Sequence, residues 1–121
     1  MKRHILLAWA TLAVSACAAT PGPIVEAGYP TGSLAVAAIE RGDWATAERL
    51  LTRDSPLSAD DPARLINLGR VYMDTDRPEE ALAAWQRALA ASSHGEVETL
   101  DGRSARTDVI ARDALAHYRR F

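Results

Sequence analysis

Apolar residues recur at helical spacing in four segments between residues 33 and 95, and polar or helix-breaking residues separate these segments. The pattern predicts helices over residues 33–40, 44–53, 62–74 and 78–92. Gly42 can adopt the left-handed conformation that ends a helix, while Asp43 and Asp61 are good N-cap residues. Pro62 and Pro78 would occupy first-turn positions, where a missing N–H costs nothing. We therefore expect two consecutive helix pairs, the first of them starting with Ser33 as its N-cap.

The last 26 residues, 96–121, follow a different pattern. Residues 96–100 alternate in character and precede the tight-turn dipeptide Asp101-Gly102, a combination compatible with a small hairpin. Thr107 can begin a last helix. The inner side of that helix would carry Ile110, Ala111, Ala114, Leu115 and Tyr118.

The two helix pairs also repeat each other in sequence. A shift of 34 residues aligns Leu34 with Leu68, Ala35 with Gly69, Ile39 with Met73, Ala47 with Ala81 and Leu51 with Trp85. The second pair carries the ordered set Leu65, Leu68, Gly69, Tyr72, Ala81, Trp85 and Ala88. This period and this order resemble the tetratricopeptide repeat, clearly in the second pair and weakly in the first. The resemblance covers about residues 28–95.

The repeat spacing has a physical basis. Small residues at Gly69 and Ala81 let the two helices of a unit approach closely, and Tyr72 and Trp85 fill the space beside them. Two units rarely form a stable solenoid alone, so a helix within residues 104–121 is expected to cap the second unit. The predicted fold is all-α, with about two tetratricopeptide-type units, four helices and a C-terminal capping helix. A plain four-helix arrangement with a chance match is the alternative.

Residues 1–16 have the features of a signal peptide. A basic start, Lys2-Arg3-His4, precedes a ten-residue apolar run over residues 5–14 that is too short to span a bilayer. The run ends in Val14-Ser15-Ala16-Cys17, which resembles the lipobox of bacterial lipoproteins. The resemblance implies cleavage before Cys17, a diacylglyceryl thioether on its sulfur and a fatty acyl group, such as palmitate, on its new amino terminus. An ordinary secretory signal with a stray cysteine is the alternative.

This anchor would be followed by a flexible tether over residues 17–32, which is rich in proline and glycine. The sequence leaves open whether Ile24, Val25 and Tyr29 dock onto the domain. Ala18, rather than an aspartate, follows the cysteine. In a Gram-negative host the resemblance then implies a lipid-anchored protein of the cell envelope, at the periplasmic face of the outer membrane. The expected divisions are residues 1–16, 17–32, 33–95 and 96–121.

Charge and side-chain inventory argue against several activities. Removal of residues 1–16 leaves 12 basic residues, all arginine, against 16 acidic ones, a balance that does not suit a nucleic-acid partner. His94 and His117 lack metal-ligand spacing, and the sequence has no phosphate-binding loop or nucleophile elbow. We therefore expect a non-catalytic protein without a cofactor or a metal ion.

In the tetratricopeptide family, the first helix of each unit lines a concave groove that binds a peptide or helix of another protein. Carried over by position, the groove residues are Val36, Ile39, Glu40, Ile66, Asn67, Arg70, Met73 and Asp74. Ile66 and Met73 would supply apolar contact, and Arg70 would pair with a carboxylate. The sequence leaves open whether the tether or the C-terminal segment covers this face.

These features predict a lipoprotein that mediates protein–protein interaction at the bacterial cell envelope, as an adaptor or assembly factor. Its partner would be another envelope protein, for example of a pilus, secretion or outer-membrane machine. A self-associating structural lipoprotein, in which repeat ends stack into a homo-oligomer, is the alternative. A small-ligand-binding protein or an enzyme is less favoured by the residues.

Overall fold

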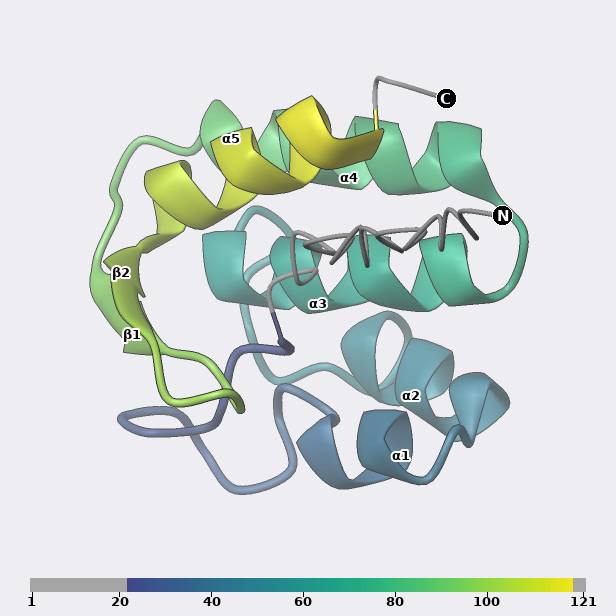
Figure 1. Ribbon diagram of the computed structural model, residues 1–121. Helices are drawn as coiled ribbons and strands as arrows, with labels where there is room; N and C mark the ends of the chain where they lie inside the picture. The colour runs from purple at the N-terminus through teal and green to yellow at the C-terminus, as the bar shows by residue number, and fades with distance from the viewer. Residues whose placement is uncertain (1–21, 119–121) are drawn as a thin grey trace, which may run out of the picture.

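The computed structural model describes residues 22–118, which form a stack of five helices with one small hairpin beside it (Figure 1). The helices are α1 (Val36–Glu40), α2 (Trp44–Leu51), α3 (Pro62–Asp74), α4 (Pro78–Leu89) and α5 (Thr107–Tyr118). The hairpin pairs β1 (Glu96–Glu98) with β2 (Ser104–Arg106) in antiparallel register. The fold is thus mostly helical, as expected. The small hairpin that the sequence suggested around Asp101-Gly102 is present.

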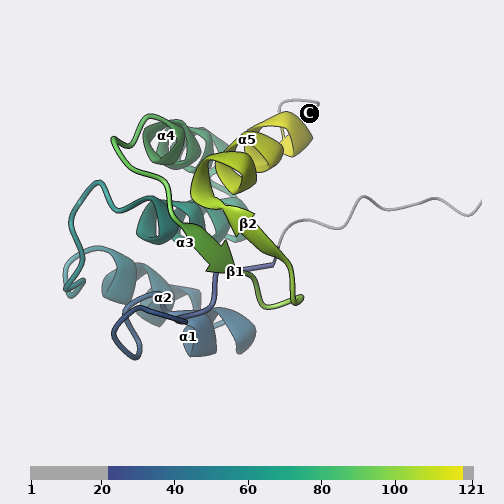
Figure 2. The ribbon, with the colours of Figure 1, turned by 90° about the vertical axis from the view of Figure 1, so that its left-hand side faces the viewer.

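The helices pack in the order of the chain. Contacts join α1 to α2, α2 to α3 and α3 to α4, and α5 lies against both α4 and α3. Helices α2 and α4 lie on one side of the stack, while α5 and the hairpin lie toward the other (Figure 2). We call the surface of α3 and α5 that is turned away from α2 and α4 the inner face.

Two of the predicted helix starts are confirmed in atomic detail. The Asp61 carboxylate accepts a hydrogen bond from the Arg64 N–H at 2.9 Å, and Pro62 begins α3. The Asp43 carboxylate accepts from the Thr46 N–H at 3.3 Å, directly after Gly42 with a φ of 68°. Both caps satisfy donors that the first turn of a helix leaves without partners.

The first helix is shorter than expected, because the chain before it forms a closed loop. The Glu26 carboxylate accepts hydrogen bonds from the N–H groups of Gly32, at 2.7 Å, and Leu34, at 3.2 Å. Ala35, in a left-handed conformation with a φ of 56°, is the actual N-cap. The prediction of Ser33 as N-cap is therefore wrong: its hydroxyl is buried and makes no hydrogen bond within the described residues.

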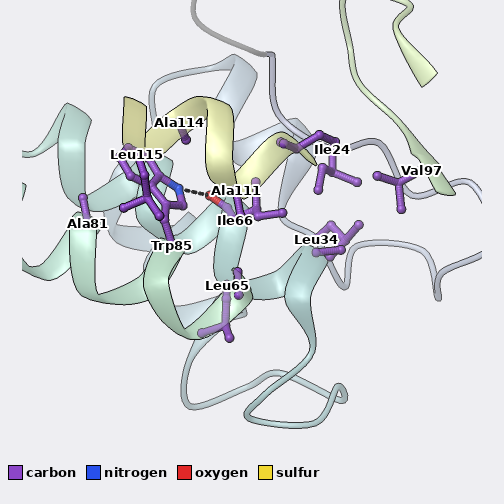
Figure 3. Packing of buried hydrophobic residues seen from close by; sticks show 13 residues of the cluster. Ile24, Leu34, Leu65, Ile66, Ala81, Trp85, Val97, Ala111, Ala114 and Leu115 are labelled. Atoms are coloured by element: carbon purple, nitrogen blue, oxygen red, sulfur yellow. Dashed lines mark hydrogen bonds between the residues drawn. The ribbon is translucent and has the colours of Figure 1, made fainter. Parts of the chain in front are cut away.

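The main core forms where α3, α4 and α5 meet. Trp85 of α4 is 2% exposed, and its indole N–H donates to the Ile66 carbonyl at 3.1 Å (Figure 3). Tyr118 stacks on the indole with ring centroids 5.1 Å apart. A Cβ built on Gly69 would lie 2.3 Å from the indole nitrogen, so the ring fits only because this position has no side chain. The small-beside-large packing expected for Gly69 and Trp85 is confirmed.

A second, smaller core lies between the two helix pairs. Leu51 of α2 is buried there with Leu68 and Val71 of α3. At its edge, the Arg77 guanidinium binds both Glu48 carboxylate oxygens, at 3.0 and 2.6 Å. This hydrogen bonding holds the pKa of the Glu48 carboxyl below its ordinary value. The loop before α4 is thereby attached to α2.

Helix α5 covers the second unit, as predicted. Ile110, Ala111, Ala114 and Leu115 are all buried in the main core. The start of α5 is held to the end of α4 by His94, whose ring nitrogens lie 2.9 Å from the Thr107 hydroxyl and 3.2 Å from the Leu89 carbonyl. The helix therefore shields apolar surface that a two-unit array would leave open.

Candidate functional site

The centre of the inner face is α3, where one side of the helix carries positions i, i+1, i+4, i+7 and i+8, namely Ile66, Asn67, Arg70, Met73 and Asp74. Only part of this stripe reaches solvent. Ile66 and Asn67 are buried, Arg70 and Met73 are half-buried, and Asp74 is exposed. The stripe is therefore closed at its N-terminal end and open at its C-terminal end.

Asn67 closes the stripe by holding the chain's own N-terminal segment. Its side-chain oxygen accepts from the Ile24 N–H at 2.8 Å, and its amide group donates to the carbonyls of Ile24, at 3.0 Å, and Leu34, at 2.9 Å. Both Asn67 and Ile24 are 0% exposed. Because the amide binds backbone groups of the same chain, Asn67 has no surface to offer a partner. The prediction that Asn67 contacts a partner in the groove is wrong for this conformation.

The segment from Pro23 to Val25 also extends the hairpin. Ile24 forms an isolated antiparallel bridge with Thr99. The Val25 N–H donates to the Glu98 carbonyl at 2.9 Å, and the Leu100 N–H donates to the Pro23 carbonyl at 2.8 Å. Figure 3 shows the Ile24 side chain near Leu34 and Val97, at the end of the core away from Trp85.

The prediction of a flexible tether over residues 17–32 is therefore wrong for residues 22–32. This stretch packs on the domain rather than acting as a free linker, since burial of Ile24 and satisfied backbone groups offset the loss of chain entropy. Residues 17–21, with Cys17, and the expected signal peptide 1–16 lie outside the described residues.

A small cavity of about 20 Å³ lies where the closed part of the stripe, Ile66 and Asn67, meets Arg70. Its lining includes Gly22, Pro23, Arg70, Ala114 and Tyr118. The Arg70 guanidinium lies 2.8 Å from the Asp74 carboxylate in an ion pair whose two side chains are 29% and 34% exposed. The cavity lining thus combines a charged side chain of α3, Arg70, with an aromatic ring at the end of α5, Tyr118.

The groove residues predicted on α1 do not join this site. Ile39 is buried in the second core, and Glu40 is exposed at the end of α1. Val36 is half-buried against the main core and borders a separate hollow of about 180 Å³ with Glu26 and Leu50. The structure brings Ile66, Asn67 and Arg70 together around one cavity, and it leaves the α1 residues elsewhere.

The sequence predicts Ile110, Ala114 and Tyr118 on the packed side of the last helix, and it does not reveal that they line one cavity with Arg70. One signal for the closed end was available. Asn67 is the only asparagine of the chain and lies between Ile66 and Leu68 in an apolar run. A lone polar side chain in such a run is more often a buried, hydrogen-bonded group than a ligand-binding one.

The described residues carry no sign of metal chemistry or of membrane spanning. Within residues 22–118, no group of three or more His, Cys, Asp or Glu side chains could hold a metal ion. In the same range, no helix has the length and apolar character needed to cross a bilayer.

The stacked helix pairs define a helical-repeat protein, and comparison with known families identifies the repeat. Tetratricopeptide-repeat models match residues 28–53 and residues 62–94. The matches coincide with the α1–α2 and α3–α4 pairs, so both helix pairs are similar to tetratricopeptide repeats. No curated protein and no solved structure matches it significantly. Such repeats generally mediate protein–protein interaction, and the family is typically a non-catalytic scaffold.

Proposed function

We propose that the protein is a lipid-anchored adaptor of the bacterial cell envelope that binds a segment of another envelope protein. The observation that carries the binding part is the open end of the inner face. Arg70, which is paired with Asp74, and Tyr118 line the cavity, and half-buried Met73 follows Arg70 on α3 by three residues. Arginine can exchange an intramolecular carboxylate for that of a partner, and methionine adapts to varied apolar surfaces.

The anchoring part rests on the order of basic start, apolar run and Val14-Ser15-Ala16-Cys17. Several acyl chains at Cys17 would hold the protein firmly, because each buried methylene adds about 0.8 kcal/mol of membrane affinity. Lipidation would confine the search for a partner to one membrane. Because Ala18 rather than an aspartate follows Cys17, we propose the outer membrane as the site of anchoring in a Gram-negative host.

Replacing Cys17 by Ala is expected to move the protein from the membrane fraction to the soluble fraction, because the lipid-accepting sulfur is lost. Fractionation of cells that produce each form, followed by immunoblotting, measures the change. Replacing Ser15 by Ala keeps a small residue before the cysteine and should leave the protein in the membrane fraction. Membrane attachment that persists in the Cys17→Ala variant would contradict the anchor.

A photo-crosslinking residue at position 74 is expected to capture a discrete partner in intact cells, because Asp74 lies at the open end of the inner face. The matched control is the same residue at position 79, since Glu79 is also acidic and exposed but lies in the first turn of α4. Immunoblots should show a product from position 74 and none from position 79.

The size of the product distinguishes the candidate functions. A product that equals two copies of the chain would support the self-associating structural protein instead of the adaptor. The same products from both positions, or none from position 74, would contradict binding at the inner face.

A further inference from the structure

The packed N-terminal segment limits how far the domain can stand from a membrane. This inference rests on the proposed lipid anchor at Cys17. Gly22 is the first described residue, and Ile24 is held by Asn67 and by the hairpin. Five residue steps separate Cys17 from Gly22, and a fully extended chain spans at most about 18 Å over that length. A free tether through residue 32 would have reached about 50 Å.

This reach is short compared with the domain itself. A domain of about 100 residues has a radius of gyration of about 13 Å and is therefore roughly 30 Å across. The headgroup layer of each leaflet accounts for about 5–7 Å of the reach. Gly22 must therefore stay within roughly 12 Å of the headgroup surface, less than half the width of the domain.

The side of the domain on which Gly22 lies is defined by its neighbours. A Cβ on Gly22 would lie 3.3 Å from the Asp101 backbone nitrogen, at the hairpin turn. Gly22 also borders the inner-face cavity with Arg70 and Tyr118. In Figure 2 the described chain begins on the side of the hairpin turn and α5, and α2 and α4 lie on the opposite side.

We infer that the short link holds the domain against the bilayer, with the hairpin turn and the inner-face cavity toward the lipid headgroups. Helices α2 and α4 then face away from the membrane. Leu100, at the hairpin turn, is 44% exposed, and its N–H donates a hydrogen bond to the Pro23 carbonyl. An exposed apolar side chain therefore lies close to the point where the described chain begins.

Charge contributes little attraction to this orientation. Two arginines on this side are already paired within the domain, Arg70 with Asp74 at 2.8 Å and Arg103 with Asp113 at 3.7 Å. The geometry of the link therefore sets the orientation, and moderate salt should not change it. A partner that reaches Arg70 and Asp74 must approach along the membrane surface, as the membrane-proximal segment of another anchored protein does.

The test measures which side of the domain meets the headgroups. Cys17 is the only cysteine and its sulfur is blocked in the lipidated form, so single-cysteine variants can be labelled selectively. Full-length lipidated Leu100→Cys and Ala83→Cys proteins, each with a fluorophore, are reconstituted into phosphatidylcholine vesicles with and without nitroxide-headgroup lipid. Ala83 is the matched control, because it is exposed on α4 and borders a hollow with Leu68 and Tyr72 on the far side.

The label at position 100 should be quenched several-fold more than the label at position 83. Insertion of twenty Gly/Ser residues between Thr20 and Pro21 adds a reach of about 25 Å and should abolish most of that difference. Equal quenching at both positions in the chain without the insertion would overturn the inference. A difference that survives the insertion would also overturn it, because the link would then not set the orientation.

Anchoring is measured separately, by flotation of the same samples with the vesicles. Loss of flotation in the lipidated Leu100→Cys protein would overturn the proposed anchor, whereas flotation with equal quenching would overturn only the orientation. The Cys17→Ala/Leu100→Cys protein should not float. If it floats, the domain binds lipid directly and the inference that the link alone holds it is wrong.

Discussion

Replacement of Asn67 by Leu is expected to lower the free energy of unfolding by about 3–5 kcal/mol. The substitution leaves the Ile24 N–H, the Ile24 carbonyl and the Leu34 carbonyl without their buried partner. Each such group costs about 1–3 kcal/mol when it stays buried and unpaired. Release of the segment would relieve that cost but would expose Ile24, whose burial is worth about 1.5–3 kcal/mol.

Thermal unfolding followed by circular dichroism measures the effect, and a domain of this size should lose roughly 15 °C in melting temperature. Gln86→Leu is the matched control, since it removes a similar amide from an exposed position and should change stability by less than about 0.5 kcal/mol. Equal melting temperatures for the Asn67 variant and the parent would show that the segment is not held as described.

The loss of stability in the Asn67→Asp variant is expected to depend on pH. The new carboxylate would be buried and would face the Ile24 and Leu34 carbonyls, so its pKa in the folded state would be raised above its ordinary value of about 3.9. A raised folded-state pKa means that the protonated form is the more stable one. The stability deficit should therefore be smallest below about pH 4 and grow as the pH rises, whereas the Asn67→Leu deficit should not vary in this way.

The Gly69→Ala substitution is expected to destabilise the domain by about 2–3 kcal/mol, although alanine favours helices by about 1 kcal/mol over glycine. The new Cβ would lie 2.3 Å from the Trp85 indole nitrogen and 2.7 Å from two ring carbons. The ring is buried, stacked on Tyr118 and bonded to the Ile66 carbonyl, so a shift of the ring would disrupt these contacts.

Denaturant unfolding measures this loss, and Gly95→Ala is its control because a Cβ there meets nothing within 4 Å. Combining Gly69→Ala with Trp85→Phe should recover part of the loss, since the smaller ring vacates the space that the new methyl group needs. A double-mutant cycle with no coupling between the two positions would contradict the proposed clash.

Local sequence signals were reliable at three places and failed at the Ser33 cap. Each of the three correctly predicted features depends on residues close together in the sequence. They are the helix cap at Asp61, the turn at Gly42 and the hairpin around Asp101-Gly102. The 34-residue period likewise predicted the pairing of small Gly69 with large Trp85. These features follow from backbone geometry and side-chain size, which are read directly from the sequence.

Site prediction failed where distant residues compete for the same surface. The position of Asn67 in the repeat predicts a groove residue, but its partner is Ile24, 43 residues earlier in the chain. Likewise Leu34 was expected inside the first helix, and hydrogen bonds to Glu26 and Asn67 keep it in the preceding loop. Neither of these contacts could be predicted from the spacing of residues along the chain.

The sequence by itself determined the repeat, most of the helix boundaries and the capping helix, because spacing, caps and small-beside-large pairs act locally or at a fixed period. Only the tertiary structure decided which part of the inner face is open. That choice depends on whether burial of Ile24 and three hydrogen bonds to Asn67 outweigh the entropy of ordering residues 22–34. These energies arise from contacts between segments that are far apart in the sequence, so they can be assessed only once the structure shows which segments lie side by side.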